Sequence, residues 1–192
     1  MNRSAIYEGL TNAAWAFVFL YVDVNLGTLN LLPEWAGCLL LWRAIALLEG
    51  ERRDLALLRP FCLGLGLWHA VDWVLAIFGL SLKGRFLPLD VILSVVTLYF
   101  VFQLLTDLAA LADTYQDPGL TLGKNLRFCR SVTAVLTVIY VLPLPWQDNL
   151  IAVTVLVLVQ LGLSLAILYY LFRLRKCFLA PPAGQAPGTP PA

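Results

Sequence analysis

Six long apolar segments follow one another along this chain of 192 residues, and they constrain the fold more than any motif does. Hydrophobic residues make up 60% of the sequence and charged residues only 13%. A water-soluble domain needs more polar surface than this to cover its core, so the composition predicts that a lipid bilayer is the solvent. We therefore expect an all-α integral membrane bundle of six transmembrane helices, arranged as three helical hairpins.

The apolar segments give approximate bounds for the six spans. They are Ile6–Val22, Glu34–Leu48, Phe61–Leu82, Phe86–Leu108, Phe128–Leu142 and Asn149–Arg173. The second and fifth are short for a hydrocarbon core of about 30 Å, because a helix rises about 1.5 Å per residue. Residues 1–179 form the expected transmembrane domain, and the Pro-, Ala- and Gly-rich residues 180–192 are expected to be a disordered cytoplasmic tail.

Basic residues gather on one side of the predicted spans. The clusters on this side are Arg52, Arg53 and Arg59, then Lys124, Arg127 and Arg130, and finally Arg173, Arg175 and Lys176. Only Lys83 and Arg85 fall on the other side. Because cytoplasmic loops of membrane proteins are enriched in Lys and Arg, this asymmetry predicts that both termini are cytoplasmic.

Each even-numbered span begins with Leu-Pro followed closely by an acidic residue. The three pairs are Pro33 with Glu34, Pro88 with Asp90, and Pro145 with Asp148. Proline suits the first turn of a helix, and an acid there complements the helix dipole. The spacing therefore indicates either three independent helix starts or a threefold repeat of two-helix units.

The segment between the first two spans has an unusual composition. It is too polar for a lipid-facing helix and too apolar for an ordinary loop. Non-helical backbone at membrane depth is tolerated only against protein or a wet cavity. We therefore expect a re-entrant segment that dips back into the bundle and includes Asp23, Asn25, Asn30, Pro33 and Glu34.

An intramembrane polar cluster is predicted from five side chains in the spans: Arg43, His69, Asp72, Gln103 and Gln160. Asp72 lies near the middle of the third span, His69 shares its helix face, and Arg43 is close enough in depth to contact Asp72. One interpretation is a proton or cation site with Arg43 as counter-charge. The other is a structural salt bridge and hydrogen-bond set, or an Arg43 that merely snorkels to the inner interface.

The remaining chemistry-bearing residues predict little. Asp90 and Asp107 lie near span ends and are expected to be interfacial, and Asp113 and Asp117 fit a solvated helix end better than a metal site. The widely spaced cysteines predict neither a disulfide framework nor a zinc site; they are Cys38, Cys62, Cys129 and Cys177. No metal or other cofactor is expected, and no catalytic motif points to an enzyme.

One stretch carries a resemblance. The residues Asn25-Leu-Gly-Thr-Leu-Asn-Leu-Leu-Pro-Glu-Trp-Ala-Gly37, with the Leu-rich sequence to Arg43, resemble a recurrent segment of small multi-pass membrane proteins of Gram-positive bacteria. Those proteins have no assigned activity. The resemblance therefore implies an architecture and a location in the bacterial plasma membrane, and no more.

Two function classes follow as expectations. The first, which is favoured because six spans are few for a complete monomeric transporter, is a membrane-embedded accessory or structural protein that acts by packing with a partner protein or a second copy of the chain. The second is a small secondary transporter or channel with its site around Asp72, His69 and Arg43. A water-sized mid-membrane cavity lined by Asp72 would favour transport, and a dry packed interior would favour the accessory role. The lipid bilayer is the expected partner in both, and nucleic acid is not expected, since the net charge is only +1.

Overall fold

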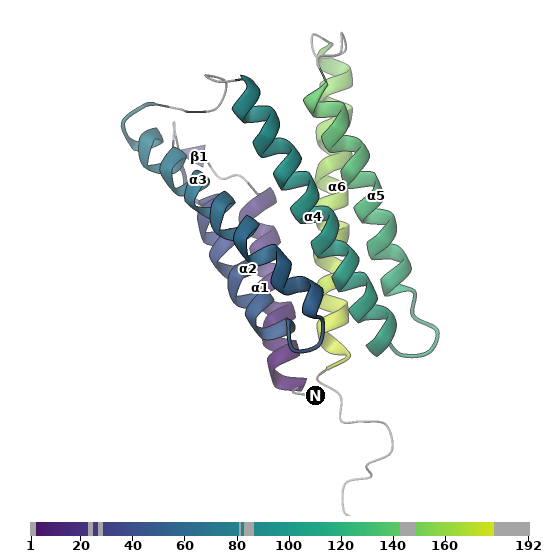
Figure 1. The fold of residues 1–192 in the computed structure, drawn as a ribbon. Helices are drawn as coiled ribbons and strands as arrows, with labels where there is room; N and C mark the ends of the chain where they lie inside the picture. Colours follow the sequence, from purple (N-terminus) through teal and green to yellow (C-terminus); the bar gives the residue numbers. More distant parts are fainter. Residues whose placement is uncertain are drawn as a thin grey trace, which may run out of the picture.

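The computed structural model describes residues 3–22, 25–26, 29–80, 82, 87–142 and 149–178. These residues form six α-helices that run alternately up and down: α1 (Arg3–Tyr21), α2 (Glu34–Leu48), α3 (Arg59–Ile77), α4 (Leu87–Tyr115), α5 (Leu122–Val141) and α6 (Leu150–Lys176) (Figure 1). A 3-10 helix, η1 (Arg53–Leu58), leads into α3. The all-α class is thus confirmed for the described residues, whose β structure is limited to a hairpin of β1 (Asn25–Leu26) and β2 (Leu29–Asn30).

Among the residues that the structure describes, three helical stretches are long and apolar enough to cross a bilayer. They are Arg53–Ile77, which joins η1 to α3, then α4 and α6, with 25, 29 and 27 residues. At about 1.5 Å per residue each exceeds a hydrocarbon core of about 30 Å. The expectation of six such helices is too high by this criterion, because α2 has only 15 residues and α5 carries Lys124, Arg127 and Arg130.

The sequence signals at helix starts act as expected where the structure describes them. Pro33 precedes α2, whose first turn contains Glu34, and α4 has Asp90 in its first turn. The third Leu-Pro-acid motif lies outside the described residues, as do Asp23 and the predicted tail. Asn149 caps α6 by accepting hydrogen bonds from the backbone N–H groups of Ile151 and Ala152.

The helices do not associate as three hairpins. The most extensive contacts join α1 to α2, α4 to α5, α2 to α3 and α1 to α6, whereas α3 and α4 barely touch. Small residues explain part of this choice: Gly37 on α2 approaches Ala16 of α1, and Gly66 on α3 faces Cys38 of α2 rather than α4. The molecule is therefore two groups of three consecutive helices joined mainly through α1 and α6 (Figure 1).

The two ends of the bundle differ in packing. We call the end where α1 begins and α6 finishes the basic end, and the end where α2, α4 and α6 begin the distal end. In α4 the buried residues start only at Phe100, in α6 only at Leu163, and in α3 they are limited to Cys62 and Leu65. The bundle is consequently packed at the basic end and open between α3 and α4 at the distal end (Figure 1).

Candidate functional site

A cleft of about 550 Å³ occupies the open distal half between α3, α4, α5 and α6. Its apolar walls are Leu65, Trp68, Leu93 and Val141. Its polar lining comes from His69, Asp90, Ser94, Thr97, Thr137, Tyr140 and Gln160. We call this space the distal cleft. It contains His69 and Gln160 from the predicted polar cluster, and Asp90, which the sequence placed at the interface.

A smaller cavity of about 120 Å³ lies deeper, toward the basic end. We call it the inner chamber. Its lining includes Arg130, Thr133, Phe102 and Tyr21, and it shares Thr97, Thr137 and Gln160 with the distal cleft. The two cavities therefore meet at these three polar side chains. The side chains of Thr97 and Gln160 make no hydrogen bond within the described part of the chain, so their polar groups are available to a solute or to water.

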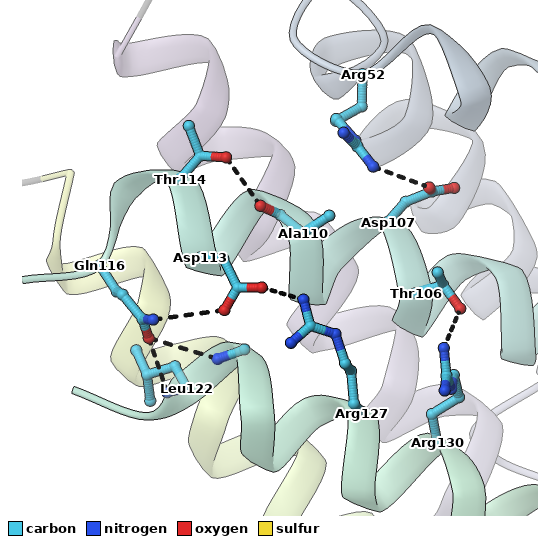
Figure 2. Close-up of polar contacts among 11 residues, drawn as sticks. Arg52, Thr106, Asp107, Ala110, Asp113, Thr114, Gln116, Leu122, Arg127 and Arg130 are labelled. Atoms are coloured by element: carbon cyan, nitrogen blue, oxygen red, sulfur yellow. Dashed lines mark hydrogen bonds and ion pairs between the residues drawn. The ribbon is translucent and has the colours of Figure 1, made fainter.

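Arg130 is the charged group of the inner chamber. Its Nη1 donates a hydrogen bond to Thr106 Oγ1 at 3.0 Å (Figure 2). Its guanidinium carbon lies 4.4 Å from the Phe102 ring centroid. The Nε atom is buried without a partner, and no carboxylate among the described residues lies within ion-pair distance of Arg130. Thr133, only 5% exposed, also has a hydroxyl oxygen without a hydrogen-bond partner. Buried polar atoms are rarely left unpaired, so the chamber has unused donors.

An apolar groove lies on the other side of the gap between α3 and α4. It measures about 520 Å³ and is lined by Phe61, Gly64, Val71, Val96 and other apolar residues. It shares Leu65, Trp68 and Leu93 with the distal cleft. These three side chains therefore separate a polar-lined space from an apolar one.

The predicted re-entrant segment meets α3 near the distal end. His69 Nδ1 lies 2.5 Å from Glu34 Oε2, and Trp73 Nε1 donates a hydrogen bond to the backbone oxygen of Asn30 at 2.9 Å. The rings of Trp35 and Trp73 pack edge to face. His69 and Glu34 were predicted in two different groups, and the structure brings their side chains into direct contact at the edge of the distal cleft. Whether the segment is re-entrant in a bilayer stays a prediction.

The proposed contact between Arg43 and Asp72 is wrong. Arg43 pairs with Glu8, and Asp72 accepts a hydrogen bond from the backbone N–H of Leu82. The reason is helix register. The ring contact between Trp35 and Trp73 sets Asp72 level with the first turn of α2, eight residues or about 12 Å before Arg43. His69 likewise has Glu34, not Asp72, as its charged partner.

Gln103 belongs to a different site, which the sequence missed. Its amide donates a hydrogen bond to Asp107 Oδ2 at 3.1 Å. Arg52 Nη2 lies 3.8 Å from Asp107 Oδ1 (Figure 2). The Asp107 side chain is only 2% exposed, so it is buried within the bundle, which the sequence did not predict. The available signal was the spacing of Gln103 and Asp107, four residues apart on one helix face.

Other charges at the basic end are also paired. Arg59 binds Glu49 at 2.8 Å, and the Tyr115 hydroxyl donates to Glu51 at 2.8 Å. Asp113, predicted to be solvated, pairs with Arg127 (Figure 2). Together with Arg52 and Asp107, these pairs link the turn between α2 and η1 (residues 49–52) with α3, α4 and α5 into one polar belt. Arg130 stands out from this belt because its contacts are a hydroxyl and an aromatic ring.

Comparison of the sequence with protein-family models, and of the sequence and structure with curated proteins and solved structures, gave no match. The resemblance to small multi-pass membrane proteins of Gram-positive bacteria therefore stays a prediction. Any assignment of function rests on the geometry of the cleft and the chamber.

Proposed function

We propose that this chain is a small membrane transporter that admits a polar solute through the distal cleft and binds it in the inner chamber. The observation that supports this proposal is the meeting of the two cavities at Thr97, Thr137 and Gln160. Ligand sites in helical membrane proteins are built from polar groups that face the bundle interior, near the middle of the bilayer. Asp72 lines neither cavity, so the proposed binding site consists of these three residues and Arg130 instead of the predicted cluster around Asp72.

The proposal includes the finer topology expected from the sequence. All six helices cross a bacterial plasma membrane, and both termini are cytoplasmic, so the basic end faces the cytoplasm. The enrichment of Arg and Lys at this end supports the orientation. The shorter or more polar helices α1, α2 and α5 then cross beside the three apolar stretches against which they pack.

The uneven packing of the two ends supports transport over a continuous pore. A transporter that works by alternating access exposes its binding site to one side while the other side is closed. Here the distal half is open, whereas the basic half is filled by buried side chains and closed by the polar belt. In the proposed orientation this arrangement corresponds to an outward-open state.

Cysteine accessibility tests the proposal. Thr97→Cys and Gln160→Cys, each in a chain whose four native cysteines are replaced, are treated in sealed vesicles with a membrane-impermeant thiol reagent from either side. We expect both to react from the distal side only. Leu104→Cys on the same helix as Thr97 is the matched control and stays unreactive, because Leu104 is buried in the closed half. No reaction at Thr97→Cys and Gln160→Cys would refute an accessible cleft.

A membrane-embedded accessory or structural role is the second candidate. The observation that favours it is the polar belt, in which charged side chains, among them the buried Asp107, tie helices together rather than face a cavity. Such a protein would act with a second copy of itself or with another membrane protein. The test is purification from native membranes with a mild detergent, followed by mass measurement of the intact complex. An accessory protein would be found with a stoichiometric partner, and a transporter would be found as an isolated chain.

A further inference from the structure

We infer that the inner chamber binds a small anion, of the size of a halide, nitrate or a short monocarboxylate, with Arg130 as its main ligand. This inference rests on the proposed function, since it names the class of solute that the distal cleft admits. The chamber combines a guanidinium, the hydroxyls of Thr97 and Thr133 and the Gln160 amide. All four can donate hydrogen bonds, and no carboxylate is among the residues that line the chamber.

The charge of Arg130 needs a counter-ion. Arg52 has Asp107, Arg59 has Glu49 and Arg127 has Asp113, but Arg130 has no carboxylate within ion-pair distance among the described residues. Arg130 lies eight residues into α5, about 12 Å from the start of that helix. A cation held at this depth is costly without compensation. An anion in the chamber would supply it and would accept a hydrogen bond from the unpaired Nε.

The size of the chamber sets the class of anion. A cavity of about 120 Å³ has room for a small ion with a few water molecules, and it excludes nucleotides and sugar phosphates. The Thr133 hydroxyl is buried and has no hydrogen-bond partner, so an anion bound here would accept a hydrogen bond from a donor that otherwise lacks an acceptor. Thr137 is a weaker candidate ligand because its hydroxyl already donates to the Thr133 carbonyl.

Asp90, the acidic residue in the lining of the distal cleft, lies at the other end, and Asp107, which is next to Thr106, is paired with Arg52. Asp90 is in the first turn of α4, sixteen residues or about 24 Å before Thr106, the hydrogen-bond partner of Arg130. Glu34 is engaged by His69. The field in the chamber is therefore dominated by Arg130, which favours an anion over a cation at this point of the path.

The test measures anion binding on the full chain in detergent. Thermal unfolding is followed at constant ionic strength while sodium gluconate, whose anion is too bulky for the chamber, is replaced by sodium chloride, nitrate or acetate. We expect saturable stabilisation by at least one small anion, since a ligand of the native state raises the unfolding temperature. Arg130→Gln should abolish this response, and Thr133→Val should weaken the affinity at least threefold.

Arg127→Gln is the matched control, because Arg127 is one turn away on α5 but pairs with Asp113 at the surface. It should keep the wild-type anion response. Arg130→Lys serves if Arg130→Gln does not fold: it keeps the charge but loses the Nε donor and the planar stacking on Phe102, so its affinity should fall at least tenfold. An absent response in the wild type, or an equal response in the wild type, Arg130→Lys and Thr133→Val, would overturn the inference.

A flux assay separates this inference from the proposed function. The protein is reconstituted into liposomes that contain a halide-sensitive dye, and external chloride or iodide is added. Anion binding that depends on Arg130 without flux would support the inference and refute transport. Cation flux is followed in parallel vesicles that contain a potassium-sensitive dye. Such flux without anion binding would refute the inference and support transport.

Discussion

The ion pair between Arg52 and Asp107 gives the sharpest test of the packed basic end. The Asp107 side chain is 2% exposed, whereas that of Arg52 is 37% exposed. Arg52→Gln therefore leaves a buried carboxylate with Gln103 as its main hydrogen-bond donor, and breaking a buried pair in this way costs about 3–5 kcal/mol. Asp107→Asn leaves an arginine that can reach water, so its cost should be about 1.5–3 kcal/mol, the value of a hydrogen bond to a charged group.

The two changes together should cost less than their sum. Once Arg52 and Asp107 are both neutral, neither leaves an unpaired buried charge, so we expect a coupling free energy of about 1–3 kcal/mol. The measurement is a double-mutant cycle on unfolding in detergent, followed by tryptophan fluorescence.

The chain provides a matched control in the pair of Arg43 and Glu8. Its nitrogen–oxygen distance is also 3.8 Å, but the two side chains are 70% and 56% exposed. An exposed pair contributes about 0–1 kcal/mol, so the corresponding cycle should show almost no coupling. Equal coupling in the two cycles, or costs at Arg52 and Asp107 that simply add, would refute the argument that burial decides the value of these pairs.

Three further predictions concern two glycines, the membrane topology and the segment before α2. In a thermal unfolding assay, Gly123→Ala should destabilise the protein by about 1–3 kcal/mol, because its new Cβ would overlap the Asp113 carboxylate and lie 2.8 Å from the Ala109 carbonyl oxygen. Gly162→Ala has open space around it, so in the same assay it should be neutral or stabilising by up to about 1 kcal/mol. Reporter fusions after Gln116 and Gly84 should fall on opposite sides of the membrane, cytoplasmic for the first; a shared side would contradict the six-span topology. Backbone amides of residues 29–34 should be protected from hydrogen exchange, because Trp73 binds the carbonyl of Asn30; rapid exchange throughout would identify an ordinary loop.

The elements that the sequence predicted well are those with a local cause. Pro33 and Glu34 act on the helix that they begin, and the apolar runs of α4 and α6 are set by the length of a bilayer. The observed limits of α2 are those of the predicted span, because the residues at each end of the helix determine where it begins and ends. Such signals need no knowledge of which helix lies beside which.

The partners of the polar residues could not be predicted in the same way. Depth along a helix follows from counting residues, but a contact also requires a rotation about the helix axis and a register between helices. Arg43 and Asp72 were placed at similar depths, and the register set by the contact between Trp35 and Trp73 separates them. Asp107 was judged by its distance from the end of a span, although the face that it shares with Gln103 decides its burial.

The opening at the distal end follows from what packs between α3 and α4. Trp68 and Leu93 line both the distal cleft and the apolar groove, so closing the gap must bury them against each other. In water such burial would be favourable by about 25 cal/mol for each Å² of apolar surface. In a bilayer, lipid tails would cover the part of these side chains that faces the apolar groove, so much of this driving force would be absent. An open gap between α3 and α4 is therefore inexpensive in a membrane, and groups inside the cavities decide whether it closes. Arg130 has no carboxylate partner among the described residues, so an anion bound to it would change the balance between the open and the closed gap most.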